Sequence, residues 1–269
     1  MQHRAKKRFG QNFLVDANII QKIIYSINPV AEDHLIEIGP GLGALSQPLL
    51  NILTRLDVIE LDRDLIPELN NLEGHDRLHI HNIDVLSFDF TDFQQSNFKH
   101  DKIRIIGNLP YNISTAVLFH LIKHRDIIQD MHFMLQKEVV ERIAADVGSH
   151  DYGRLSIMMQ LYFRISPLFV VAPQCFRPSP KVQSAIVRLT PRSKVAISAD
   201  EHDAFAKLIR KAFSHRRKTI KNTLKGFCDT AQMDAADINP GKRPQELALN
   251  EYVKLFRQLH QASPVTPPV

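Results

Sequence analysis

Short apolar runs alternate with segments of helical periodicity from about residue 34 onward. Apolar runs of about four to eight residues that end in glycine or a polar residue are typical of buried strands, and apolar positions three or four residues apart are typical of amphipathic helices. The predicted strands are 34–39, 56–60, 77–81, 102–107, 131–135 and 182–189, and the predicted helices are 43–53, 63–72 and one that begins near Ser114. This alternation predicts a parallel α/β sheet, whose ligands bind beyond the carboxyl ends of the strands.

The pattern changes near Thr190, and only segments of helical period follow, over about 200–213, 216–227 and 250–261. Pro191 is a natural breakpoint, so we expect a domain boundary within 190–199. This gives a sheet-containing domain of residues 1–193 and a small all-helical domain of residues 194–269. The proline-rich segment 263–269 is predicted to be disordered.

The composition, with 44% hydrophobic and 23% charged residues in 269, is that of an ordinary globular protein. No apolar stretch approaches the ~18 residues of a membrane span, and no secretory signal is recognisable, so we expect a cytoplasmic protein without a membrane partner. The two cysteines, Cys175 and Cys228, are far apart and lack metal-ligand spacing. Two isolated thiols argue against a disulfide framework and against a metal site.

Positive charge is concentrated in two clusters, although the net charge of the chain is only +5. Residues 3–8 form the first cluster, and the second lies within residues 207–225. Either cluster alone is ordinarily a flexible tail or a solvated helix face, but two of them beside a nucleotide-type fold favour a polyanionic partner. In helical register Arg217, Lys221 and Lys225 share one face, and Ile220, Leu224 and Phe227 line another.

A glycine motif, Glu37-Ile-Gly39-Pro-Gly41-Leu-Gly43, lies between a predicted strand and a predicted helix. Glycines at such a position let the backbone turn sharply and approach a ligand closely. The motif also satisfies the relaxed G-x-G-x-x-A pattern of dinucleotide enzymes, and glycine can simply punctuate a turn. Glu60, at the end of the next strand, could bind ribose hydroxyls with either kind of cofactor.

Asp84 favours adenosine of a methyl donor over a dinucleotide, because it follows the third strand, where its carboxylate could accept a hydrogen bond from the adenine amino group. Glu60 and Asp84 would then hold the ribose and the base of one adenosine. A dinucleotide would also need a cradle for its pyrophosphate, for which no candidate is evident. The simpler interpretation of Asp84 is a helix N-cap.

The candidate catalytic loop is Asn108-Leu109-Pro110-Tyr111, which directly follows the fourth strand. One reaction that suits this loop is transfer to the N6 nitrogen of adenine, which is a poor nucleophile because its lone pair is delocalised into the ring. The Asn108 amide oxygen and the carbonyl of Leu109 or Pro110 could each accept one N6 hydrogen and so direct the lone pair. Positioning of two reactants can lower a barrier by roughly 7–11 kcal/mol, so no acid or base is required.

The other two residues of this loop suit an extruded base. Pro110 fixes its φ near about −65° and stiffens the loop. Tyr111 offers a ring face for stacking, worth roughly 1–3 kcal/mol per base, and base flipping is needed because a paired adenine hides N6. The alternative is a turn, since Asn and Pro favour turns and Tyr is often part of a core.

These motifs and several others resemble the small-subunit ribosomal RNA adenine N6,N6-dimethyltransferases almost from end to end. The shared segments are Lys7–Leu14, Glu37–Gly43, Val58–Asp62, Gly107–Ser114, Met134–Glu138, Tyr152–Ser156, Phe176–Val182 and Arg216–Asn222. The resemblance implies a Rossmann-like class I methyltransferase sheet followed by a helical domain. It also implies S-adenosylmethionine as cofactor.

Residue by residue, the resemblance implies that Asn12 and Leu14 close over the cofactor, beside the glycines of the motif. Gly39 would contact the methionine portion, with Gly41 next to it, and Asn108 would lie at the point of methyl transfer. Phe176 would form a second aromatic wall for the target base, the alternative being a core phenylalanine.

The implied target is two adjacent adenines in the 3′-terminal hairpin of 16S rRNA, each dimethylated late in small-subunit assembly. The second domain would be the docking module for RNA. Its expected phosphate contacts come from the second basic cluster, at Arg216, Arg217, Lys218, Lys221 and Lys225. We expect the protein to act as a monomer.

Three alternatives remain at this point. A related enzyme that methylates one adenine of large-subunit RNA would share the cofactor motifs, although Tyr152–Ser156 and the basic segment from Arg216 favour the small-subunit enzyme. A ribosome-assembly factor could act chiefly by binding the immature subunit. A nicotinamide oxidoreductase would bind a dinucleotide and not S-adenosylmethionine.

Overall fold

The structure, a computed structural model, describes residues 11–99 and 101–261. The chain divides into two compact units. The first consists of the chain up to residue 140 together with 164–191, and the second of 141–163 together with the chain from 192 onward. The predicted basic cluster at 3–8 and the predicted disordered tail at 263–269 lie outside the described residues.

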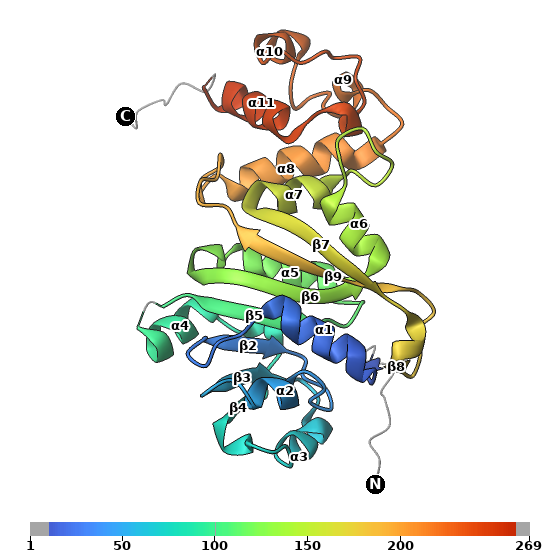
Figure 1. Ribbon diagram of the computed structural model, residues 1–269. Coiled ribbons are helices and arrows are strands. Elements are labelled where there is room, and N and C mark those ends of the chain that lie inside the picture. The colour runs from blue at the N-terminus through green and yellow to red at the C-terminus, as the bar shows by residue number, and fades with distance from the viewer. Residues whose placement is uncertain (1–10, 100, 262–269) are drawn as a thin grey trace. The chain divides into compact units, whose positions relative to one another are not determined.

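The first unit is built on a large sheet, in which the described residues contribute seven strands in the order β4-β3-β2-β5-β6-β9-β7 (Figure 1). Their bounds are β2 (Leu35–Ile38), β3 (Leu56–Ile59), β4 (Leu78–His81), β5 (Ile103–Asn108), β6 (Ile128–Gln136), β7 (Phe163–Val171) and β9 (Ser184–Pro191). Strands β2 to β6 pair in parallel. Each predicted strand matches an observed strand to within a few residues at each end, so the expected α/β sheet is present.

The sheet is mixed, and this corrects the prediction of a parallel sheet. Strand β9 runs antiparallel to β6, with Ser184 opposite Gln136 and Leu189 opposite Met131. A buried apolar run looks the same in either direction, so the sequence pattern could identify this strand but not its orientation. Strand β7 is not among the predicted elements, and neither is the small antiparallel sheet of β1 (Phe13–Leu14) and β8 (Phe176–Arg177).

Helix α1 (Ala17–Ile27) is also absent from the predicted elements, although the sequence carries clear signals for it. The Asp16 carboxylate caps the helix by accepting from the backbone N–H groups of Asn18 and Ile19 at 3.0 Å. Isoleucines recur along one face, and Ile23, Ile24 and Ile27 are buried. The helix ends at Asn28, whose φ of 49° lies in the left-handed region that terminates helices.

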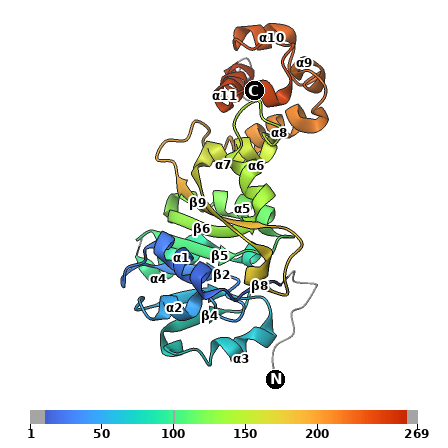
Figure 2. The ribbon, with the colours of Figure 1, turned by 45° about the vertical axis from the view of Figure 1, so that its right-hand side comes forward.

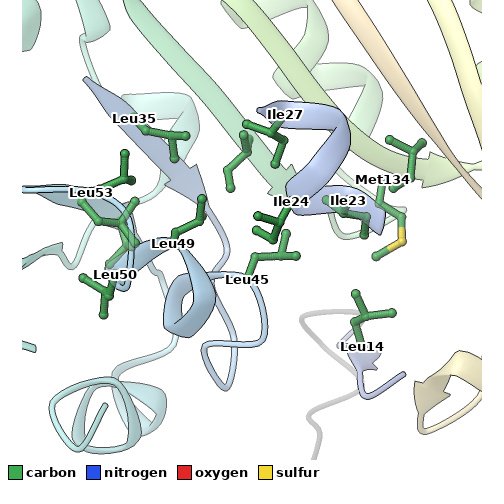
Figure 3. Packing of buried hydrophobic residues seen from close by; sticks show 14 of the residues in the cluster. Leu14, Ile23, Ile24, Ile27, Leu35, Leu45, Leu49, Leu50, Leu53 and Met134 are labelled. Atoms are coloured by element: carbon green, nitrogen blue, oxygen red, sulfur yellow. The ribbon is translucent and has the colours of Figure 1, made fainter. Parts of the chain in front are cut away.

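Helices α1 and α2 (Ser46–Leu50) pack on the same face of the sheet. Figure 3 shows isoleucines of α1 beside Leu45 and Leu49 in the middle of the cluster, with Leu35 of β2 at one margin and Leu14 of β1 and Met134 of β6 at the other. The fully buried members of this cluster contribute much of the hydrophobic stabilisation of the unit, at roughly 1.5–3 kcal/mol per large side chain.

The remaining helices of the first unit follow the strands of the sheet. They are α3 (Ile66–Leu69), α4 (Phe90–Phe98) and α5 (Ser114–Ile122), with short 3₁₀ turns η2 (Arg63–Leu65), η3 (His75–Arg77), η4 (Val85–Ser87), η5 (Arg125–Ile127) and η6 (Pro173–Cys175). Helix α5 lies behind β6 in Figure 1, on the opposite side of the sheet from α1. The predicted helices 43–53 and 63–72 are shorter in the structure, since turns replace their first or last residues.

The second unit is helical (Figure 2). It contains the second half of α6 (Lys137–Ala144), together with α7 (Arg154–Tyr162), α8 (His202–Ala212), η7 (Phe213–His215), α9 (Ile220–Thr223), α10 (Thr230–Ala235), η8 (Pro244–Glu246) and α11 (Leu249–Gln261). Its chain resumes at residue 192, within the predicted boundary region of 190–199, but it also includes 141–163, which the predicted domains placed with the sheet. The reason is that α7 packs against α8 and α11.

The predicted helix over 216–227 is wrong, because only α9, with four residues, is helical there. The backbone N–H of Ile220 donates to Lys242 O at 2.7 Å, and that of Lys221 donates to Pro240 O at 3.3 Å. These tertiary bonds replace the helical bonds that the periodicity had suggested. Repulsion between the basic residues at i and i+4 also disfavours a continuous helix.

None of the helices in the described part of the chain is long and apolar enough to span a membrane.

Candidate active site

The carboxyl ends of the first four parallel strands surround a cavity of about 330 Å³ in the first unit. The cavity wall includes every residue that was predicted to bind the cofactor or to form the catalytic loop: Asn12, Leu14, Gly39, Gly41, Glu60, Asp84, Asn108, Leu109, Pro110 and Tyr111. The parallel order of β4-β3-β2-β5 brings together the residues from the ends of these strands, and Asn12 and Leu14 come from the segment at β1, in the separate sheet with β8.

The glycine motif forms a tight loop after β2. Gly39 and Gly41 have φ values of 68° and 59°, which favour glycine. A Cβ atom at position 41 would lie only 3.0 Å from the Phe13 ring. At Gly39 and Gly41 the backbone itself therefore lines the cavity, and the Gly39 N–H donates to Ile59 O at 2.9 Å.

Glu60 follows β3 and is held in place by the backbone around it. Its Oε1 accepts from the Asp62 N–H at 2.7 Å, and its Oε2 accepts from the Gly41 N–H at 3.3 Å. The residue is 7% exposed, and burial raises the pKa of its carboxyl. The carboxylate is therefore oriented at the cavity wall and linked to the glycine loop.

Glu37 is a further carboxyl group at this wall, which the sequence analysis treated only as the start of the glycine motif. It is almost fully buried on the otherwise apolar strand β2, where Ser46 Oγ donates to its Oε2 at 2.6 Å. Burial raises its pKa to about 7, and the nearby charge of Glu60 adds to the shift. The sequence feature that could have identified Glu37 as a site residue is an acidic side chain within an otherwise apolar strand.

Asp84 is a helix N-cap, as the simpler interpretation predicted, and it also lies at the cavity wall. Its Oδ1 accepts from the Leu86 N–H at 2.9 Å, which makes it the N-cap of η4. The same side chain lines the cavity. An N-cap of this kind fixes the orientation of the carboxylate, so the cap and a ligand contact are compatible.

Residues 11–14 form one wall of the cavity. Strand β1 pairs with β8, with Leu14 opposite Phe176. The Gln11 side-chain amide donates to Asp62 Oδ2 at 2.9 Å, and the Asn12 carbonyl accepts from Asn108 Nδ2 at 3.0 Å. Gln11 is a cavity residue that the sequence prediction missed, because its contact spans 51 positions.

Asn108, at the end of β5, has an amide with two distinct ends. Its Nδ2 is used in the bond to the Asn12 carbonyl, and this leaves Oδ1 as the acceptor end. A side-chain amide has both donors and an acceptor, so fixing the donor end determines where the oxygen points. Asn108 lines the cavity and is half-buried.

The carbonyl groups of the catalytic loop are not equivalent. The Pro110 carbonyl already accepts from the N–H groups of Ile113 and Ser114, both at 3.1 Å, and these two bonds use its two lone pairs. Among the described residues, no hydrogen-bond donor is recorded for the Leu109 carbonyl. Of the two backbone carbonyl groups expected as possible acceptors for an N6 hydrogen, we therefore favour that of Leu109.

Tyr111 also lines the cavity, and its hydroxyl lies 2.7 Å from Ser184 Oγ. Burial raises the pKa of its phenol. Phe176 is placed differently from the prediction: its side chain is fully buried in the core cluster with Leu14, and it is not part of the cavity wall. In this structure Phe176 is thus a core phenylalanine, because β8 pairs with β1 and turns the ring inward.

The predicted RNA contacts lie in the second unit and are all exposed: Arg216, Arg217, Lys218, Lys221 and Lys225. They do not form a face of one helix, since only Lys221 lies in α9. Arg216 also donates to the carbonyl groups of His150 and Tyr152. The basic cluster is therefore a turn-rich surface.

No group of three or more His, Cys, Asp or Glu side chains within 11–99 and 101–261 is arranged to hold a metal ion. The polar groups of the first unit that could contact a ligand gather in the cavity at the edge of the sheet. That cavity combines a glycine loop, buried carboxylates and a polar catalytic loop.

Comparison with known proteins agrees with this arrangement. Residues 2–261 match the family model described as ribosomal RNA adenine dimethylase. The chain is 50% identical over 259 residues to the ribosomal RNA small subunit methyltransferase A of Pseudomonas putida, an alignment that covers 96% of each protein.

Two solved structures are also similar. A dimethyladenosine transferase from Plasmodium falciparum has a TM-score of 0.79 at 27% identity, over 93% of this chain and 98% of that one. A 23S rRNA methyltransferase has a TM-score of 0.69 at 23% identity, over 93% of this chain and 100% of that one, which shows the shared fold. Because the family model covers nearly the whole chain, the protein belongs to the ribosomal RNA adenine dimethylase family.

Proposed function

We propose that the protein transfers methyl groups from S-adenosylmethionine to N6 of adenine in small-subunit ribosomal RNA and forms N6,N6-dimethyladenosine. The observation that carries the proposal is the Asn108 amide, whose oxygen remains available at the cavity while its nitrogen is bonded to Asn12. The name of the relative from Pseudomonas putida supports small-subunit RNA as substrate. The 23S rRNA methyltransferase, at 23% identity, supports only the fold.

The residues of the cavity fit S-adenosylmethionine. Gly39 and Gly41 leave room that a Cβ atom would fill, next to backbone groups suited to the methionine portion. The oriented carboxylate of Glu60 suits the ribose hydroxyls, and the remaining oxygen of Asp84 suits the adenine amino group. Residues 11–14, with Asn12 and Leu14, would cover the bound cofactor. When bound, the cofactor supplies an electrophilic methyl group on a sulfonium.

Asn108 and Leu109 would orient the nucleophile. On the unmethylated adenine, the Asn108 Oδ1 and the Leu109 carbonyl would each accept one N6 hydrogen, which draws the nitrogen away from conjugation and directs its lone pair toward the methyl group. On the singly methylated adenine, one of these two oxygens would accept the remaining hydrogen. The bound cofactor would supply the methyl group, Asn108 and Leu109 would hold the nitrogen that receives it, and the methylated amine would then release a proton to water. Orientation of this kind needs no catalytic base, which agrees with the absence of a buried catalytic histidine among the cavity residues.

Tyr111 would stack on the extruded adenine, which must leave the helix before N6 can react. Its ring belongs to the wall that carries Asn108 and Leu109. Base stacking on an aromatic ring contributes roughly 1–3 kcal/mol. Phe176 is not part of this proposal, since its ring lies in the core.

The second unit would dock on RNA through its exposed basic cluster, because lysine and arginine contacts to phosphates set affinity more than sequence choice. The family resemblance supports two adjacent adenines in the 3′-terminal hairpin of 16S rRNA as the target, late in subunit assembly. It likewise supports action in the cytoplasm by a monomer.

The test is methylation of immature small subunits from cells that lack this activity. Purified protein and labelled S-adenosylmethionine should yield N6,N6-dimethyladenosine, identified by mass, and primer extension should stop at two adjacent adenines of 16S rRNA. Stops in 23S rRNA only, or no labelled nucleoside, would refute the proposal.

A binding role in assembly is the second candidate, favoured by the exposed basic cluster. The two roles separate in a Glu60→Ala variant, which should lose cofactor binding and keep RNA binding. Full rescue of a deletion strain by this variant would mean that binding is the dominant role.

A further inference from the structure

Tyr111 and Ser184 are 73 positions apart, yet their hydroxyl oxygens are 2.7 Å from each other. Tyr111 is half-buried and forms part of the cavity wall, whereas Ser184 is fully buried and does not line the cavity. A buried hydroxyl group requires a hydrogen-bond partner, and the recorded partner of Ser184 Oγ is the Tyr111 phenol. The bond therefore joins the cavity wall to a point inside the sheet.

The position of Ser184 is fixed by the sheet. It is the first residue of β9 and pairs with Gln136 of β6, and the next residue back, Gln183, accepts from the Lys137 N–H at 2.9 Å. Strand β6 is the neighbour of β5, which carries Asn108 at its end. The serine hydroxyl is thus held at a set distance from the catalytic loop by regular strand pairing.

Tyr111 is held at its backbone and at the far end of its ring. Its carbonyl accepts from Ser114 Oγ at 3.1 Å, at the start of α5, and its hydroxyl meets Ser184. Anchoring the backbone and the hydroxyl oxygen fixes the direction of the ring axis. Since a phenolic O–H prefers to lie in the plane of its ring, the bond to Ser184 also favours one rotation of the ring about that axis. Tyrosine phenols are protonated at neutral pH, and burial raises the pKa of the Tyr111 phenol further.

We propose that Ser184 is a positioning residue for methyl transfer, which holds the Tyr111 ring as a preorganised face for the target adenine. The inference rests on the proposed function. Ser184 acts through Tyr111 and does not itself touch the cofactor or the reacting nitrogen. Loss of its hydroxyl frees the axis of the Tyr111 ring to swing away from this position, so that fewer bound adenines have N6 in line with the methyl group.

The experiment is a double-mutant cycle with Ser184→Ala, Tyr111→Phe and the two combined, measured as single-turnover methylation of immature small subunits. Ser184→Ala should lower the transfer rate about 5- to 20-fold, with the cofactor Kd changed by less than about twofold. Tyr111→Phe should give a similar loss, and the double variant should be no slower than the slower single variant, because both changes remove the same bond. Ser184→Thr keeps a hydroxyl and should recover most of the rate.

Ser26→Ala is the matched control, since Ser26 Oγ donates only to Ile23 O within α1. It should transfer at the rate of the unchanged protein. Multiplicative losses in the cycle, or an unchanged rate in Ser184→Ala, would overturn the positioning role. If Ser184→Ala lowers thermal stability so far that folding fails, Tyr111→Phe alone carries the test, and a full rate in that variant also overturns it.

The results that would refute the proposed function differ from those that would refute the role of Ser184. If the unchanged protein does not methylate small-subunit RNA, or if Asn108→Ala is as active as the unchanged protein, the proposed function is refuted, and with it this inference. If the unchanged protein is active, Asn108→Ala is inactive and Ser184→Ala is fully active, only the role of Ser184 is refuted.

Discussion

The side-chain amide of Asn108 has one group that is used within the protein and one that is left for a substrate. Its nitrogen donates to the Asn12 carbonyl, which belongs to the segment that covers the cavity. The same residue therefore links the orientation of the acceptor oxygen to the placement of residues 11–14. A catalytic amide that is oriented before the substrate binds does not lose conformational freedom at the reaction step.

Replacement of Asn108 by Ala should lower the rate of methyl transfer by about 100-fold or more, because a misplaced reactant can cost that much even when both partners stay bound. The cofactor Kd should change by less than about threefold, since Glu60 and Asp84 remain. Single-turnover methylation and calorimetry measure the two quantities. Asn18→Ala, at an exposed position, is the control. A variant that keeps a tenth of the rate would contradict the role of Asn108.

The buried carboxyl of Glu37 predicts how the free energy of unfolding depends on pH. Its pKa in the folded protein is raised from 4.5 to about 7 by burial. Between these pH values the native state holds a proton that the unfolded state has lost, so the free energy of unfolding falls as the pH rises through this window and is level above it. The upper limit of the loss is about 3 kcal/mol, at 1.36 kcal/mol per pKa unit.

Glu37→Gln should remove this pH dependence, because glutamine stays neutral and its carbonyl can still accept from Ser46 Oγ. Urea unfolding of the cofactor-free protein at several pH values measures the effect. The stability of the variant relative to the unchanged protein should increase from pH 5 to pH 8. Glu32→Gln, at an exposed position, is the control. Its curve of unfolding free energy against pH should run parallel to that of the unchanged protein. Parallel curves for Glu37→Gln as well would contradict the buried, proton-binding carboxyl.

At the scale of elements, the strands β2 and β5 approach so closely that position 107 must be glycine. A Cβ atom there would lie 2.5 Å from Ile38 O, a backbone atom that cannot move independently of its strand. Asn108 is the next residue, so any displacement of β5 moves the catalytic loop. Gly107, which the close packing of β2 and β5 requires, is thus followed directly by Asn108 of the catalytic loop.

Gly107→Ala should destabilise the protein by about 1–3 kcal/mol, the usual cost of overpacking, and should also slow methyl transfer. The thermal unfolding midpoint and the single-turnover rate report the two effects. Gly153→Ala is a suitable comparison, because an added Cβ would meet its nearest atom at an ordinary 3.9 Å. A Gly107→Ala protein that is as stable as Gly153→Ala would show that the strands can separate without strain.

The strands were predictable because each is a short run with apolar residues, mostly buried in the sheet. Chemistry-bearing residues lie at or shortly after the carboxyl ends of four of them. Once the strands are parallel and adjacent, Gly39, Glu60, Asp84 and Asn108 necessarily meet at one edge. Local pattern was sufficient for this part of the site, since every such residue is near the end of its own strand.

Contacts between distant segments could not be predicted in this way. The antiparallel β9, the pairing of β1 with β8 and the bond from Tyr111 to Ser184 all depend on tertiary placement. The burial of Phe176 has the same origin, because β8 turns its ring into the core. In the basic cluster, the bonds from Ile220 and Lys221 to Lys242 and Pro240 overrode a helical period.

At the scale of the whole molecule, the two units have different chemical character. The first holds the cavity with its buried carboxylates, and the second carries exposed basic residues on turns and short helices. A turn-rich surface presents lysine and arginine side chains in several directions, which suits the irregular backbone of folded RNA better than one straight helical row would. Such contacts release counterions, so they make binding depend on salt.

The change of Arg217, Lys221 and Lys225 together to Gln should weaken binding to immature small subunits and flatten its dependence on salt. If all three contact phosphates, the slope of log K against log salt should fall by about 2, at roughly 0.7–0.9 per contact. The matched control changes the exposed Lys99, Lys102 and Lys123 of the first unit to Gln, which removes the same charge. An equal fall in slope for both triple variants would mean that net charge, and not a docking surface, governs binding. A slope that falls only in the first variant would locate phosphate contacts in the second unit, because bulk charge is equal in the two proteins.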